Sequence, residues 1–297
     1  MRILMTNHSL RAPGGTETWT QTMAGEFVRR GHDVTIFTLM PGEMAKRMPC
    51  EVVSKPPVKE RFDAIFVNHN TCLGIIFPVE GPKVFTSHGP AHGLERPTLG
   101  ADHYVAVSEE VRAANAACGF FCDIVRNPID LEKFREGPGG GDSLPRVFIN
   151  CKNEKALMKA RRACGLVGFP LDYIHYTANP DYAPAERMRN FDIAITSGRG
   201  VLEALACGMS AIVFNGRLDG SVTADGWVTA DNVEDFARFN FSGRSKGMNW
   251  DAGDLEACLN RYDPQNLRWW VEENHDVRKI ADAYLELVGE RALAAKA

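Results

Sequence analysis

Residues 196–208 have the sequence Thr196-Ser197-Gly198-Arg199-Gly200-Val201-Leu202-Glu203-Ala204-Leu205-Ala206-Cys207-Gly208. They follow an apolar run, 191–195, that is typical of a buried strand, and the last glycine closes a predicted helix. The N-terminus of such a helix attracts anions, because its first N–H groups lack helical partners and its dipole adds partial positive charge. Arg199 adds a guanidinium for phosphate oxygens, and Glu203, one turn later, is placed to accept hydrogen bonds from sugar hydroxyls. The stretch therefore predicts a nucleoside diphosphate site with a residue that contacts the ribose.

Strand and helix signals alternate along the chain on both sides of this stretch. The expected strands are 2–6, 33–39, 63–68, 83–86, 103–107, 147–150, 172–176, 191–196 and 211–214. The expected helices are 16–30, 108–117, 154–164, 183–188 and 201–206, followed by a helical tail. Strands separated by helices of this length predict parallel sheets.

The chain has 297 residues, which suits two domains of roughly 100–200 residues each. A Gly- and Pro-rich segment, 138–144, is the best linker. We therefore expect an α/β protein with two Rossmann-like, doubly wound lobes, 1–137 and 145–297, the second carrying the helical tail. Ligands of such sheets bind at the carboxyl ends of the strands, so the cleft between the lobes is the expected site.

Composition excludes several classes of function. The formal charge of −4 gives no general basic field, so nucleic acid is not favoured as a partner. No apolar run approaches the ~20 residues of a transmembrane helix, and the first residues lack the pattern of a signal peptide, so we expect a cytoplasmic protein. The eight cysteines form no Cys-x-x-Cys pair, and no Asp-x-Asp follows a predicted strand. We therefore expect neither structural zinc nor a catalytic metal.

Four segments occur in a recognisable order across both halves. They are Gly14-Gly15-Thr16-Glu17; Val107-Ser108-Glu109-Glu110 with Asn127-Pro128-Ile129-Asp130 up to Phe134; Asn150-Cys151-Lys152-Asn153-Glu154-Lys155; and 202–208. Together they resemble the Gly-Gly-x-Glu loop, the hinge, the Arg/Lys loop and the Glu-containing helix of the retaining nucleotide-sugar glycosyltransferases of family 4. The resemblance covers about residues 1–215 and implies the GT-B architecture.

The resemblance also implies roles for individual residues. The implied donor-binding residues are Gly14, Gly15, Lys152, Lys155, Gly198, Arg199, Gly200 and Glu203. His88, which resembles the family's Thr-x-His strand end, and Lys152 are the implied catalytic residues, while Glu17 and Asn70 would bind the acceptor. The implied reaction moves a sugar from a UDP- or GDP-sugar to a hydroxyl of a glycan, a lipid-linked or another acceptor, with retention of configuration. The donor is a substrate, and no cofactor or metal is implied.

Each of these positions also suits an ordinary structural role. Gly14 and Gly15 suit a plain turn, and the two lysines suit a solvated helix start. Glu203 suits a surface helix. His88 suits a loop histidine with satisfied hydrogen bonds, and His8, His69 and His92 lie on similar loops and compete for its role.

The chain departs from the family pattern at two places. Cys151 stands near the expected arginine, so Lys152 would replace it as a point charge. The family's first glutamate, near the donor sugar, falls at Ile195 here. A catalytically silent nucleotide-sugar-binding protein or partner subunit is therefore the main alternative to a transferase. A UDP-sugar epimerase is less favoured, and nicotinamide-dependent oxidoreduction lacks its Gly-x-Gly-x-x-Gly fingerprint.

Overall fold

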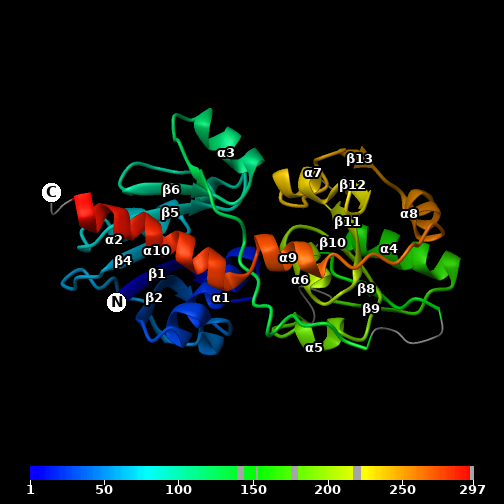
Figure 1. The fold of residues 1–297 in the computed structure, drawn as a ribbon, viewed down its shortest axis with the longest axis horizontal. Coiled ribbons are helices and arrows are strands. Elements are labelled where there is room, and N and C mark those ends of the chain that lie inside the picture. Colours follow the sequence, from blue (N-terminus) through cyan, green and yellow to red (C-terminus); the bar gives the residue numbers. More distant parts are fainter. Residues whose placement is uncertain (139–143, 152, 175–179, 217–221, 295–297) are drawn as a thin grey trace. The chain divides into compact units, whose positions relative to one another are not determined.

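The computed structural model describes residues 1–138, 144–151, 153–174, 180–216 and 222–294 (Figure 1). It divides the chain into two compact units. The first contains Met1–Pro128 and the segment that starts at Asp276, and the second contains Ile129–His275. Each unit is a sheet with helices packed against it, so the predicted α/β class is confirmed.

In the described part of the first unit the sheet has the strand order β3-β2-β1-β4-β5-β6-β7, and all its pairs are parallel. The strands are β1 (Arg2–Leu10), β2 (Asp33–Pro41), β3 (Glu51–Val53), β4 (Ala64–Val67), β5 (Lys83–Ser87), β6 (His103–Ala106) and β7 (Asp123–Ile124). The helices are α1 (Gly15–Arg29), α2 (Asn70–Ile76), α3 (Glu109–Ala116) and α10 (Val277–Ala294), with single turns at Ala45–Arg47 and Gly93–Glu95.

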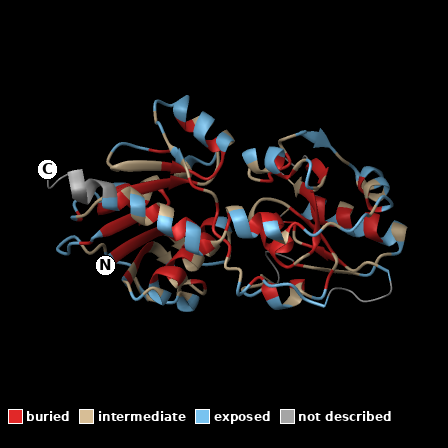
Figure 2. Ribbon diagram, in the orientation of Figure 1, coloured by how far each residue is buried: buried red, intermediate tan, exposed pale blue. Residues whose placement is uncertain are grey.

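Helices cover both faces of the first sheet, because its strands are apolar on both sides. Ile65 and Val67 of β4 pack in the cluster that includes the buried side chains of α2. Phe66, between them, points to the other face and lies 5.3 Å from the ring of Phe27 on α1. A strand that is buried on both faces is typical of a parallel sheet, and Figure 2 shows these strands as buried.

In the described part of the second unit the strand order is β13-β12-β11-β10-β8-β9. Strands β8 (Val147–Ile149), β9 (Leu171–Tyr173), β10 (Ile193–Thr196) and β11 (Ser210–Gly216) pair in parallel, and β12 (Val222–Trp227) and β13 (Met248–Asn249) add antiparallel edges. The helices are α4 (Glu154–Val167), α5 (Ala185–Met188), α6 (Arg199–Ala206), α7 (Val233–Arg238), α8 (Ala252–Leu259) and α9 (Arg268–Asn274).

The second sheet is also doubly wound. Ile193 and Ile195 of β10 join the apolar cluster that contains α4 and α8. Ala194, between them, joins the cluster that contains α6, α7 and α9. Successive residues of a strand point to opposite faces, so the two clusters are the two layers that cover this sheet.

The boundary between the units differs from the prediction. We expected the first lobe to extend to residue 137, but Ile129 and Phe134 are buried in the core of the second unit beside Leu202 and Leu205. The N–H of Ile129 also donates to the carbonyl of His275 at 2.7 Å. The second unit therefore begins at residue 129, and most of the predicted linker, 138–144, lies outside the described residues.

The helical tail is divided between the units, whereas we expected all of it in the second lobe. Helix α9 remains in the second unit, but α10 belongs to the first. Tyr284 of α10 is fully buried, shares a 2.9 Å hydrogen bond with Thr86 of β5, and packs edge-on against Trp19 and Phe66. Arg30 of the first unit forms an ion pair with Asp282. The apolar face of α10 thus covers the same side of the first sheet as α1.

Strand β12 was not predicted, because Asp225 and Gly226 are poor strand formers. Tertiary contacts stabilise this strand in place of local strand propensity. Asp225 is fully buried, and one of its carboxylate oxygens accepts from the N–H of Lys246 at 2.7 Å. Gly226 has a φ of 88°, a value that glycine adopts without strain.

Candidate functional site

The loop between β10 and α6 carries Ser197 and Gly198, within the stretch predicted to bind a nucleoside diphosphate. Gly198 has a φ of 60°, which only glycine adopts readily, and its N–H donates to the carbonyl of Phe241 at 2.8 Å. A Cβ on Gly200 would lie 2.4 Å from Oγ1 of Thr196. Both glycines are therefore required by the sharp turn from strand to helix. The turn places the N-terminus of α6 directly after the carboxyl end of β10.

Arg199 and Glu203 are held to each other. Nε of Arg199 lies 2.8 Å from Oε1 of Glu203, and the two side chains are only 10% and 9% exposed. Residues four apart on a helix share one face, so the pair forms within a single turn. A guanidinium has five N–H donors, and a carboxylate has two oxygens, so this contact uses only part of the capacity of either group. The pair fixes both side chains at the start of α6, where the sequence predicted phosphate and ribose contacts.

The loop after β8 lies beside this turn, because β8 and β10 are neighbours in the sheet. Oγ1 of Thr196 donates to the carbonyl of Asn150 at 3.0 Å. Asn153 caps α4 by accepting from the N–H of Lys155 at 2.9 Å, and Lys155 stands exposed in the first turn of that helix. Lys152, the other predicted lysine, lies outside the described residues. The starts of α4 and α6 thus share one edge of the sheet.

Cys151, which stands near the family's expected arginine, is buried, and this burial raises the pKa of its thiol to about 12. Its Sγ lies 3.8 Å from the carbonyl of Ile195. A neutral, buried thiol supplies no positive charge to a phosphate. Any cation from this loop must therefore come from the neighbouring lysines.

One segment beside the predicted site was missed by sequence reasoning. The loop 239–243 follows α7 and carries two non-glycine residues at positive φ, Asn240 and Phe241, both at 50°. It is tied to the site by the bond from Gly198 to Phe241. It is also tied to the neighbouring strand β11, where Nδ2 of Asn215 donates to the carbonyl of Ser242 at 2.9 Å. Strained backbone of this kind is concentrated at functional sites. The pair Asn240 and Gly243 was the available signal, since both residue types favour turns.

In the first unit, Gly14 and Glu17 form the start of α1. Gly14 is in extended conformation, and a Cβ there would lie 2.3 Å from Oε2 of Glu17. Oγ1 of Thr16 donates to the same oxygen at 3.1 Å. The carboxylate of Glu17 therefore folds back over the helix N-terminus, where it already supplies the favourable negative charge. This geometry favours a hydroxyl ligand over a phosphate at this loop. A Cβ on Gly15 would meet no atom within 4 Å other than those of its chain neighbours and of its own helix backbone.

His88 lies at the carboxyl end of the first sheet in a chain of polar side chains. Its Nε2 is 3.0 Å from Oδ1 of Asn68, which follows β4. Nδ2 of Asn68 donates to Oγ1 of Thr20 on α1 at 2.9 Å, and Nδ2 of Asn7 on β1 donates to the same oxygen at 3.0 Å. The ring of Trp19 packs edge-on against His88 at 5.3 Å. The network joins β1, α1, β4 and β5 at one place.

The other histidines that competed with His88 have different surroundings. His69 is buried and accepts from the N–H of His8 at 3.0 Å through Nδ1. Burial, followed by the nearby His8 and His92, lowers the pKa of His69 to about 4. It therefore stays neutral near pH 7 and serves the structure. His8 contacts Oγ1 of Thr71 through Nδ1 at 2.9 Å.

Asn70, the predicted acceptor residue, begins α2 and holds the neighbouring loop. Its Nδ2 donates to the carbonyls of Gly93 at 2.8 Å and Arg96 at 3.2 Å. Its amide oxygen is the atom that a ligand hydroxyl would use.

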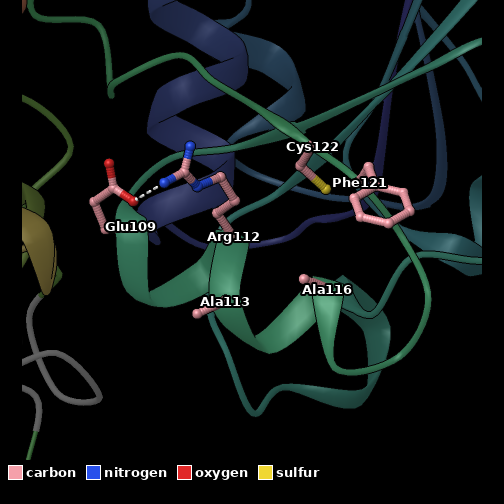
Figure 3. A pocket seen from close by; sticks show the side chains of 6 residues that line it. All are labelled: Glu109, Arg112, Ala113, Ala116, Phe121 and Cys122. Atoms are coloured by element: carbon pink, nitrogen blue, oxygen red, sulfur yellow. Dashed lines mark hydrogen bonds and ion pairs between the residues drawn. The ribbon is translucent and has the colours of Figure 1, made fainter.

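Two surface pockets lie apart from these residues. One, of about 370 Å³, is in the first unit between α3 and the chain before β7, and Figure 3 shows Arg112 paired with Glu109 at one end and Phe121 and Cys122 at the other. The other, of about 460 Å³, is in the second unit and is lined by polar residues that include Glu136 and Asp192. None of the predicted site residues that the structure describes lines either pocket.

Within the described ranges, no three His, Cys, Asp or Glu side chains are grouped so that they would hold a metal ion. In the same part of the chain, no helix has the length and apolarity that crossing a bilayer requires.

Comparison with known proteins gives a likeness in structure and none in sequence. No protein-family model matches the chain, and no curated protein matches it either. An α-glucosyltransferase solved in complex with UDP and a 13-mer DNA containing a HMU base is similar over 97% of this chain and 99% of its own, with a TM-score of 0.62 and 12% identity. AviGT4, a glycosyltransferase involved in avilamycin A biosynthesis, is similar over 100% and 98%, with a TM-score of 0.54 and 15% identity.

MurG from Acinetobacter baumannii is similar over 96% of this chain and 100% of its own, with a TM-score of 0.52 and 13% identity. At such identities the likeness concerns the fold. Together with the two doubly wound units, it shows that the chain has the GT-B fold.

Proposed function

We propose that this protein is a glycosyltransferase that moves a sugar from a UDP- or GDP-sugar to an acceptor hydroxyl. The observation that carries the proposal is the buried pair of Arg199 and Glu203 at the N-terminus of α6, directly after β10. It combines positive charge and helix dipole for a diphosphate with a fixed carboxylate for ribose hydroxyls. The fold supports the proposal, since the similar solved proteins include glycosyltransferases, one of them in complex with UDP. A UDP-sugar is therefore our first choice of donor.

In the proposed reaction, the bond between the anomeric carbon and the β-phosphate oxygen breaks, and the acceptor oxygen forms the new bond to that carbon. The diphosphate gains negative charge as it leaves. Arg199, the N-terminus of α6 and the lysines at 152 and 155 would stabilise that charge. The acceptor hydroxyl loses its proton, and His88 is our candidate to receive it. We assign the donor to the second unit and the acceptor to Glu17 and Asn70 of the first.

We further propose that the reaction retains configuration and needs no metal. The resemblance to family 4 supports retention, and the cationic side chains would replace a divalent ion at the diphosphate. The acceptor remains a hydroxyl of a glycan, a lipid-linked sugar or another molecule. Gly14, Gly15, Gly198 and Gly200 would let backbone approach the ligands closely.

One observation favours a second candidate, a nucleotide-sugar-binding protein without turnover. Ile195, where family 4 has its first glutamate, is fully buried in the middle of the second sheet. The backbone there is strand rather than loop, so the side chain at this position is packed in the core and does not face a ligand. A binder of this kind would bind UDP and release none from a UDP-sugar.

The deciding experiment combines a thermal-shift titration with UDP, GDP and ADP and an assay of nucleotide release from the corresponding sugars. We expect UDP to raise the melting temperature and Glu203→Gln to abolish the rise. Glu186→Gln is the matched control, because Glu186 lies in the same unit and is 74% exposed. Stabilisation without release would identify a binder. No shift with any nucleotide would contradict the donor site itself.

A further inference from the structure

The network that includes His88 fixes the positions of protons as well as of side chains. Asn7, Thr20 and Asn68 are fully buried, so each of their hydrogen bonds must be made within the protein. His88, the fourth residue of this network, is half-buried. The direction of each bond follows from counting donors and acceptors, starting at Thr20.

A hydroxyl has one hydrogen and two acceptor lone pairs. Oγ1 of Thr20 lies 2.8 Å from the carbonyl of Thr16, which can only accept, so the hydroxyl hydrogen is used there. The same oxygen must then accept from both of its other neighbours. For Asn7 this orientation has separate support, because its Oδ1 accepts from the N–H of Ser9 at 3.2 Å and its Nδ2 therefore faces Thr20 at 3.0 Å.

Asn68 has the same constraint. Its Nδ2 must face Thr20, at 2.9 Å, since the opposite orientation would place its carbonyl oxygen against an oxygen with no hydrogen to donate. Its Oδ1 therefore faces His88, at 3.0 Å from Nε2. An amide oxygen can only accept, so Nε2 of His88 must carry a hydrogen.

We propose that Asn68 is a positioning residue, which holds His88 in the Nε2–H tautomer and so makes Nδ1 the nitrogen that accepts from a ligand hydroxyl. Thr20 acts through Asn68 by setting the orientation of its amide. The tautomer assignment follows from the network alone, whereas the ligand hydroxyl rests on the proposed glycosyltransferase function. If His88 takes a proton, Nδ1 is protonated and the bond from Nε2 to Asn68 is kept. The ring therefore keeps its orientation in both protonation states.

The tautomer can be read directly by NMR of the full chain labelled with 15N-histidine, at a pH where the ring is neutral. Long-range 1H–15N spectra distinguish the two ring nitrogens, and His88→Gln identifies the signals of His88 by their loss. We expect the wild-type spectrum to show a protonated Nε2 and an unprotonated Nδ1. A wild-type spectrum with the proton on Nδ1, or with an even mixture, would overturn the proposal.

Two substitutions of Thr20 test how the tautomer is set. Thr20→Val keeps the shape and removes the acceptor, so Asn68 can rotate its amide and the His88 signals should move toward a mixture of tautomers. Thr20→Ser keeps the hydroxyl and should keep the wild-type pattern. An unchanged tautomer in Thr20→Val, at a melting temperature that shows a folded protein, would contradict the role of the network.

Activity separates this proposal from the proposed function. If both hold, Thr20→Val should slow nucleotide release at saturating donor by about tenfold or more, with little change in KM for the donor, and Thr20→Ser should restore the rate. A wild-type Nε2–H tautomer without any response to UDP would leave the network correct and the proposed function wrong. A response to UDP with the proton on Nδ1 would contradict the role of the network and leave the proposed function standing.

Discussion

Both units gather polar side chains at the carboxyl ends of their strands, but the chemistry of the two groups differs. The second unit holds a buried charged pair, Arg199 with Glu203, on one turn of one helix. The first unit holds an uncharged network, in which Asn7, Thr20 and Asn68 lead to His88. Charge suits a phosphate, and neutral donors and acceptors suit hydroxyls. The two units thus bury different kinds of polar group, and our proposed division into a donor unit and an acceptor unit rests on this difference.

The largest expected effect breaks the charged pair. Glu203→Ala leaves the guanidinium of Arg199 buried without its carboxylate, which should lower the free energy of unfolding by about 3–5 kcal/mol in urea denaturation. The double variant Arg199→Met/Glu203→Leu removes both charges and should recover most of that stability, while the UDP-induced rise in melting temperature stays absent. Equal losses in the single and the double variant would show that the charge itself is not the cause.

The two helix N-termini can be compared through one glycine in each. Gly200→Ala should cost about 1–3 kcal/mol, because its Cβ would meet Oγ1 of the buried Thr196 at 2.4 Å within a packed turn. Gly14→Ala should cost below about 1 kcal/mol, since the atom in its way is the end of the flexible Glu17 side chain. Urea denaturation of both variants checks the difference. A costly Gly14→Ala would mean that Glu17 is held more firmly than its contacts indicate.

A third expected effect uses pH and concerns His69, the residue that follows Asn68 in the chain. The pKa of His69 falls from its ordinary 6.5 to about 4 in the folded protein, so the unfolded chain binds more protons between these values. The stability that neutral His69 contributes is therefore present above pH 6.5 and is lost as the pH falls toward 4. Between pH 7 and pH 5 the loss should be on the order of 1–2 kcal/mol.

The measurement is the urea midpoint at several pH values, for the wild type and for His69→Asn. The asparagine oxygen can still accept from the N–H of His8. We expect the variant to lose stability less steeply over this interval. The same slope in both proteins would assign the acid sensitivity to other groups.

Much of the fold was predictable because it depends on short-range patterns. Trp19, Met23 and Phe27 recur at every fourth position, which predicts the buried face of α1, and this face is confirmed. Arg199 and Glu203 are four residues apart at the start of a predicted helix, so the sequence already placed them on the same helix face. The ion pair between them did not follow, since each residue was assigned to a different part of the ligand.

The network of the first unit was only partly predictable. Sequence reasoning selected His88 by its place after a strand, but His8, His69 and His92 follow similar patterns. Asn68 carries no distinguishing signal in the sequence, because it is one amide after an apolar strand. Its contact with Thr20 joins residues 48 positions apart. Such a contact exists only after β4 and α1 have packed.

The sequence by itself determined the alternation of strands and helices, the parallel sheets that follow from it, and the sharp turn at Gly198. Periodicity and turn chemistry act within a few residues, so they can be read locally. The tertiary structure alone decided that α10 covers the first sheet and that loop 239–243 lies against Gly198. It also decided that half-buried His88, and not the buried His69, joins the network of Asn68 and Thr20. Each of these contacts joins segments that are distant in the sequence. The surfaces that meet in them therefore exist only when the chain has folded.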